Sequence, residues 1–205
     1  MKNQSILLLG GLAVLAGCAS MMGPSKEESL QAVKSSFKER GPAKLDRLDQ
    51  NEIQQICSEA QLAGKEVPQA EREALEKKVL ATIQYPADGK YLGDFKQGER
   101  IAQSGVGLQW SDKVGAPSGG NCYACHQISP QEVSFGNIGP SLKGYGKLRG
   151  TSEATLKYTW AKIWNTHAYK LCSQMPRYGA AGILTEAQIK DVMALLLDPN
   201  SPVNK

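Results

Sequence analysis

Apolar side chains recur every three or four residues along much of the chain, the spacing that places them on one face of an α-helix. In the first such segment Leu30, Val33 and Phe37 follow Ser25 and Glu28, which stand at the spacing of a capping box. Helices are predicted over residues 25–40, 49–64, 68–85, 91–104 and 185–197, and from residue 152 onward. No alternating apolar pattern is long enough to indicate a sheet. The sequence therefore predicts an all-α fold.

Two of these segments are expected to pack together. Gly98 lies in the middle of the segment 91–104, where glycine costs about 1 kcal/mol of helix stability relative to alanine. The segment 185–197 begins with Thr185 and Gln188 at capping-box spacing and carries an apolar stripe. A close helix contact would use the space at Gly98, so we expect the two helices to cross there.

Composition narrows the class of protein. The 205 residues are 41% hydrophobic and 21% charged, which excludes a collagen-like, a mostly disordered or a multi-spanning membrane chain. The net charge of +4 is too small to indicate nucleic-acid binding, and none is expected. After Arg100 there are 10 basic and 6 acidic residues, so the positive excess belongs to the second half.

The N-terminus indicates export. Lys2 precedes an apolar run, residues 6–17, that is too short for a permanent membrane span but suits a signal peptide. The run ends in LAGC at Cys18, which resembles the lipobox of bacterial lipoproteins; an ordinary signal peptide cut nearby is the alternative. We expect residues 1–17 to be a lipoprotein signal peptide and Cys18 to carry lipid that anchors the chain to a membrane in the periplasm. Disulfides persist in that compartment.

The strongest chemical motif is Cys122-Tyr123-Ala124-Cys125-His126, the attachment motif of c-type haem. On one helical turn both thiols point to the same side and can form thioethers with the two vinyl groups, while His126 faces the iron. A zinc site would need further ligands from Cys57, Cys172 or His167, and a dithiol site would need a βαβ context. One motif predicts one covalently bound haem c, with His126 as the proximal ligand.

The sixth iron ligand is predicted to be Met175, with His167 as the alternative. A thioether favours reduced iron and raises its potential. A methionine followed by proline, after the haem motif, resembles class I cytochromes c, and that resemblance also implies that the Pro140 carbonyl accepts a hydrogen bond from the His126 imidazole. Without these resemblances Met175 would be a packing residue and Gly139-Pro140 a simple turn.

Cysteine arithmetic leaves one pair. Of the 5 cysteines, one is assigned to lipid and two to haem, which leaves Cys57 and Cys172. In an oxidising compartment this predicts a disulfide that ties the N-terminal extension to the Met175 loop; two free thiols are the alternative. We expect an N-terminal helical extension over residues 18–90 and a cytochrome c domain over residues 91–205.

The resemblance extends beyond a generic cytochrome. The segments GGNCYACH (119–126), GNIGPSL (136–142), AYKLCSQMPRYG (168–179) and the tail from Gly182 to Asn204 resemble SoxX, over a region from Asp94 to the C-terminus. SoxX is the monohaem subunit of the SoxAX cytochrome complex of bacterial sulfur oxidation. The lipobox departs from the soluble members of that family.

This resemblance implies a class I cytochrome c fold and a heterodimer with a SoxA-type cytochrome subunit. The complex, an L-cysteine S-thiosulfotransferase, oxidatively joins thiosulfate to a cysteine of the carrier protein SoxYZ, and the SoxX subunit passes the released electrons to a small cytochrome c. The catalytic cysteine belongs to SoxA, so no catalytic residue is expected here. One alternative is a lipid-anchored monohaem cytochrome that carries electrons to an oxidase or peroxidase. The other is a protein-interaction module whose bound metal has a structural role and no redox function.

Overall fold

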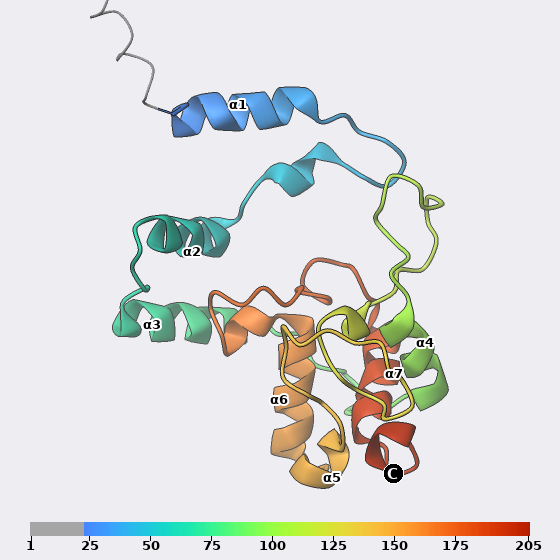
Figure 1. The fold of residues 1–205 in the computed structure, drawn as a ribbon. Helices are drawn as coiled ribbons and strands as arrows, with labels where there is room; N and C mark the ends of the chain where they lie inside the picture. Colours follow the sequence, from blue (N-terminus) through green and yellow to red (C-terminus); the bar gives the residue numbers. More distant parts are fainter. Residues whose placement is uncertain (1–22) are drawn as a thin grey trace, which may run out of the picture. The chain divides into compact units, whose positions relative to one another are not determined.

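The structure is a computed structural model that describes residues 23–205 (Figure 1). Its regular elements are helices, and strand-like pairing in this range is limited to an isolated bridge between Arg40 and Ala43. The all-α prediction is therefore confirmed. The predicted signal peptide and Cys18 lie outside the described residues. Between residues 23 and 205 no helix has the length and apolar character needed to cross a membrane.

The contacts divide the chain into two compact units, the residues before Glu39 and the residues Glu39–Lys205, and each is described by itself. The first unit contains α1 (Lys26–Ser36), which begins with the expected capping box between Ser25 and Glu28. The helix ends four residues before the predicted boundary. The hydroxyls of Ser35 and Ser36 donate to backbone carbonyls of the last turn, a local alternative to continued helix.

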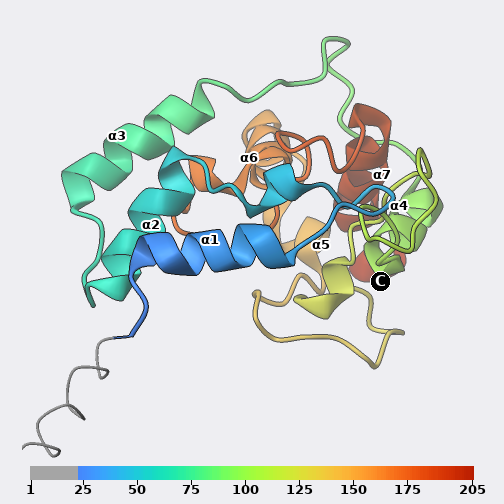
Figure 2. The same ribbon diagram turned by 90° about the horizontal axis from the view of Figure 1, so that it is seen from above.

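The second unit contains the remaining helices. They are α2 (Glu52–Leu62), α3 (Gln69–Leu80), α4 (Phe95–Gln103), α5 (Tyr145–Arg149), α6 (Glu153–Trp164) and α7 (Glu186–Leu197), with 3₁₀ turns at η1 (Leu45–Leu48), η2 (Cys122–Ala124), η3 (Thr166–Ala168) and η4 (Pro202–Asn204). In both views α2 and α3 lie on one side of α6 and α4 lies on the other (Figure 2).

Helices α4 and α7 cross at Gly98, as predicted. A Cβ atom at Gly98 would lie 2.1 Å from the carbonyl oxygen of Asp191 and 3.0 Å from the Cβ of Leu195. Figure 1 shows the two helices side by side. The missing side chain at Gly98 therefore permits the backbones to approach each other, which explains a glycine in mid-helix.

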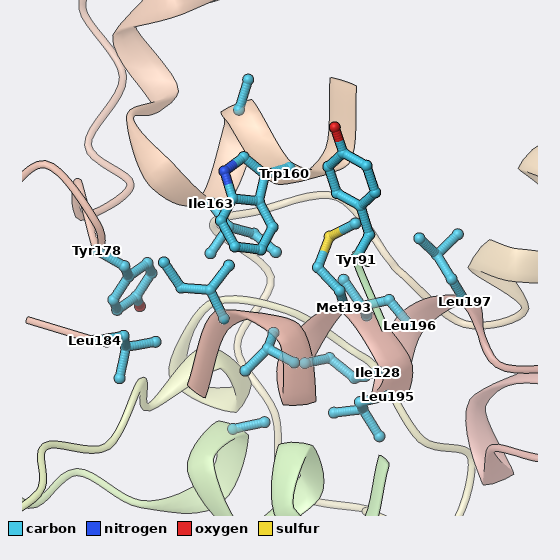
Figure 3. Packing of buried hydrophobic residues seen from close by; sticks show 14 of the residues in the cluster. Tyr91, Ile128, Trp160, Ile163, Tyr178, Leu184, Met193, Leu195, Leu196 and Leu197 are labelled. Carbon is cyan, nitrogen blue, oxygen red and sulfur yellow. The ribbon is translucent and has the colours of Figure 1, made fainter. Parts of the chain in front are cut away.

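The core of this unit forms around α7. Met193 and Leu195 are fully buried, and Trp160 of α6 and Tyr91 pack edge to face with 5.7 Å between their ring centroids (Figure 3). The indole nitrogen of Trp160 donates to the backbone carbonyl of Gln84 at 2.8 Å. Aromatic pairs in this arrangement add to the free energy of burial.

Helix α3 is joined to the core and to the loop that follows α6. Val79 and Ile83 belong to the same buried cluster as the residues of α7. The Glu76 carboxylate accepts a hydrogen bond of 2.9 Å from the backbone nitrogen of Leu171. The end of α3 therefore packs on the segment that leads to Met175.

Candidate functional site

The cysteine motif forms a tight 3₁₀ turn. Asn121 precedes it with a left-handed backbone (φ +46°), and the Cys122 carbonyl accepts hydrogen bonds from the backbone nitrogens of Cys125 (3.1 Å) and His126 (2.9 Å). Cys122 and Cys125 are both free thiols. The turn thus brings two thiols and an imidazole together within five residues.

The His126 ring is held by the segment 136–140. Its Nδ1 lies 2.7 Å from the carbonyl oxygen of Pro140, and because a carbonyl only accepts, Nδ1 carries the proton. In the neutral imidazole Nε2 is then the nitrogen with the free lone pair, the one that can bind a metal. A Cβ at Gly139 would lie 2.2 Å from the ring Cε1, so only a glycine allows this backbone to lie against the ring.

Around Cys122 the structure places a residue to which the sequence assigned no role. The Tyr178 hydroxyl donates to the Gly120 carbonyl and also interacts with the Cys122 thiol. Burial raises the pKa of Cys122 to about 12, so the thiol is neutral at physiological pH. A neutral buried thiol is a poor disulfide-exchange nucleophile, which argues against the dithiol hypothesis.

A second contact that the sequence did not predict holds the haem-attachment turn against α4. The Tyr123 hydroxyl donates to the Glu99 carboxylate of α4 at 2.9 Å and accepts from the Ser129 backbone nitrogen at 3.1 Å. Burial is the main cause that raises the pKa of Glu99. This pair ties the turn to the helix that crosses α7.

The loop that carries Met175 is covalently linked to α2. Cys57 and Cys172 form the predicted disulfide, with a Cα–Cα distance of 5.5 Å. Met175 is half-buried against the core, and its backbone nitrogen donates to the Ser173 hydroxyl at 3.2 Å. The link restricts the loop only three residues before Met175.

His167 lies on the same side of the molecule as Met175, and both line a cavity of about 590 Å³. The His167 side chain is buried and its Nδ1 has no hydrogen-bond partner among the described residues. Burial lowers the pKa of His167, and the nearby Arg177 guanidinium lowers it further, so the ring is neutral at pH 7. The choice of Met175 over His167 as iron ligand stays a prediction.

The residues fit a covalent haem better than zinc. Two free thiols on one turn match two thioether bonds, and the next residue presents an imidazole whose Nδ1 is already bonded to the Pro140 carbonyl. Of the candidate further zinc ligands Cys57, Cys172 and His167, the two cysteines are bonded to each other. Across residues 23–205 no group of three or more His, Cys, Asp or Glu side chains could hold a metal ion.

A helical domain with this haem-attachment turn defines a c-type cytochrome, and comparison with known proteins agrees. Residues 113–198 match the cytochrome c family. The chain is also 34% identical over 213 residues to an uncharacterized lipoprotein of Aquifex aeolicus (strain VF5), with 100% of both chains covered. The chain therefore belongs to the family of that lipoprotein and contains a class I cytochrome c domain, which implies covalently bound haem c and electron transfer.

Proposed function

We propose that this chain is the haem c electron-transfer subunit of a SoxAX-type complex, in which thiosulfate is oxidatively joined to a cysteine of a SoxYZ carrier. The cytochrome c domain supports the electron-transfer part. The resemblance of the Met175 loop and the C-terminal tail to SoxX supports the finer assignment, since it involves residues outside the haem motif. That resemblance is the observation on which the proposal rests.

In this proposal each site residue has a defined task. Cys122 and Cys125 would attach one haem, His126 and Met175 would bind its iron, and the Pro140 carbonyl holds the imidazole through Nδ1. A bound haem c supplies reversible one-electron exchange. The disulfide and the hydrogen bond from Ser173 restrict the Met175 loop, so the thioether stays close to its binding position.

The C-terminal tail that resembles SoxX has a structural task that can be described from its contacts. The Asn204 side chain accepts from the backbone nitrogens of Gly146 and Lys147 and donates to the carbonyls of Leu196 and Asp198. It therefore joins α5 to the end of α7. This explains why the tail is ordered, and the partner contacts remain part of the proposal.

The proposed role is a relay rather than catalysis. Joining thiosulfate to a cysteine thiol releases two electrons and a proton, and a single haem accepts one electron at a time. The reaction therefore needs two successive transfers, or a second site on the SoxA-type subunit, before the electrons pass to a small cytochrome c. We assign no sulfur-transfer residue to this chain.

We also propose a periplasmic location with a lipid anchor on Cys18. The relative from Aquifex aeolicus is named a lipoprotein and aligns over the whole chain, so its N-terminus covers the same segment. Two lipid signals are usually needed for stable anchoring. Mass analysis of the isolated protein is expected to show cleavage before Cys18 and added acyl chains.

The test is isolation under native conditions with identification of bound proteins by mass spectrometry. A second cytochrome subunit in a stable complex, with one haem per chain by pyridine haemochrome assay, is the expected result. A protein that transfers electrons to an oxidase or peroxidase and carries no stable partner would support the alternative function. If the isolated chain carries no covalent haem, both electron-transfer functions are excluded and the interaction module is the function that remains.

A further inference from the structure

The cavity of about 590 Å³ is formed by α2, the connection from α2 to α3 and the loop after α6. The disulfide between Cys57 and Cys172 forms part of its wall, and Met175 lines it as well. The attachment residues Cys122, Cys125 and His126 are not among its lining residues. The cavity is thus adjacent to the Met175 loop but separate from the haem-attachment turn.

The charged side chains that line the cavity are mostly basic. Lys65, Arg72, Lys170 and Arg177 line the cavity, against a single carboxylate, Glu66. Within the described residues, none of the four cations forms an ion pair with a carboxylate. Cationic side chains gathered around a cavity without acidic partners repel each other, and a bound anion removes that repulsion.

Two neighbouring side chains have pKa values that are shifted by burial and by nearby charges. Burial lowers the pKa of His167, and the charges of Arg177 and Lys162 lower it further. Burial also lowers the pKa of Lys162; nearby Glu76 opposes this effect, and Lys170 adds to it. The charge of Arg177 thus reaches His167, whereas at Lys162 the Glu76 carboxylate has a larger effect on the pKa than Lys170 has.

The uncharged polar lining suits an anion too. Gln54, Ser58 and Gln61 of α2 also line the cavity. Amide and hydroxyl groups donate hydrogen bonds to an anion or to water molecules around it. The volume falls within the range of small-molecule sites, so it admits a small anion together with part of its hydration shell.

We propose that this cavity is a binding site for a small divalent oxyanion of the sulfate, thiosulfate or phosphate type. Arg72 and Arg177 present planar groups of donors suited to two oxygens of one anion, and Lys65 and Lys170 act as point charges. The site depends only on the described side chains of this chain, so binding of sulfate or phosphate would support it even if the SoxAX function were wrong.

The test uses the full-length, haem-loaded protein and isothermal titration calorimetry with sodium sulfate, thiosulfate and phosphate. Titrations with sodium chloride at matched ionic strength measure the screening effect of salt alone. Saturable one-to-one binding of a divalent oxyanion is expected, with chloride giving none. Because a charged hydrogen bond is lost, Arg72→Gln is expected to weaken the affinity about tenfold.

Arg72 is the preferred position because it lies on α3, outside the loop that carries Met175. Lys170→Gln is a second variant, and Lys147→Gln on α5, outside the cavity, is the matched control that removes one charge from an exposed side chain. Circular dichroism verifies that each variant folds. Weaker binding in the first two variants with an unchanged control supports the site.

Three results would overturn the proposal. The first is the absence of saturable binding to the wild-type protein. The second is an equal loss of affinity in Lys147→Gln, which would reflect net charge alone. The third is a wild-type protein that binds no oxyanion, together with a changed haem absorption spectrum in both Arg72→Gln and Lys170→Gln. That result would mean that these cations interact with the haem carboxylates instead.

Discussion

Gly139 is the residue at which a single methyl group is expected to disturb His126, the predicted iron ligand, most directly. Its added Cβ would meet His126 Cε1 at 2.2 Å, and the ring is fixed on its other side by the hydrogen bond to Pro140. Gly139→Ala is therefore expected to displace the imidazole and lower the unfolding free energy of the haem-loaded protein by about 1–3 kcal/mol. Denaturant unfolding and the absorption spectrum measure both effects.

Gly105→Ala is the matched control, because its new Cβ would make only an ordinary contact with the Asn121 side chain, at 3.6 Å. It should leave the absorption spectrum unchanged. A Gly139→Ala protein with wild-type spectrum and stability would show that the segment 136–140 moves away without cost, and would weaken the assignment of Pro140.

Met175→Ala tests the sixth ligand at the same scale. Loss of a thioether that favours reduced iron is expected to lower the reduction potential, and the open position should bind carbon monoxide. Potentiometric titration and carbon monoxide difference spectra are the measurements. His167→Ala is the comparison variant and should retain the wild-type potential. If the two variants exchange these results, His167 is the ligand.

Local spacing predicts the haem-attachment residues, which the structure brings together in one turn, but not the residues that support this turn. Cys122, Cys125 and His126 lie within one turn, so their sequence order defines their geometry. Tyr178 contacts Gly120 from 58 residues away, and Tyr123 contacts Glu99 across 24 residues. Such pairs have no local pattern, because the packing of α4 and the Met175 loop brings them together.

At the scale of elements, the crossing of α4 and α7 makes a strong prediction for Gly98→Ala. Alanine favours an isolated helix over glycine by about 1 kcal/mol. Here its Cβ would lie 2.1 Å from the Asp191 carbonyl oxygen, so the helices must separate. We expect a net loss of about 1–3 kcal/mol in the free energy of unfolding, measured by denaturant titration.

Lys96→Ala on the exposed side of α4 is the control for Gly98→Ala and should change the stability by less than about 0.5 kcal/mol. A stabilised Gly98→Ala protein would mean that helix propensity outweighs the contact, and the close crossing would then be wrong.

Helix boundaries were predictable where a cap is local and unpredictable where a distant residue determines the end. The capping boxes at Ser25 and Thr185 are present, whereas α2 begins from Asn51 and Gln54 instead of the predicted Asp49. The third helix ends at Leu80 rather than residue 85. The carbonyl of Gln84 accepts from Trp160, 76 residues away, and so lies outside the helix.

At the scale of the whole molecule, the even number of remaining cysteines predicted the disulfide, but it did not predict the cavity that lies beside it. The sequence indicated that Cys57 and Cys172 connect the extension with the Met175 loop. It gave no sign of the cavity beside that bond, because the cationic lining comes from three separate segments. Lys65 and Arg72 meet Lys170 and Arg177 only when α2 and α3 pack on the loop.

The same bond carries the last prediction. It joins residues 115 positions apart, and a cross-link of that span restricts the unfolded chain strongly. The double variant Cys57→Ser, Cys172→Ser is therefore expected to lose about 2–5 kcal/mol of unfolding free energy. Because the bond restricts the loop three residues before Met175, the variant should also bind carbon monoxide more readily. Reductant should give wild-type protein the same properties and leave the variant unchanged. If carbon monoxide binding stays at the wild-type level while stability falls, the disulfide stabilises the fold but does not hold Met175 in place.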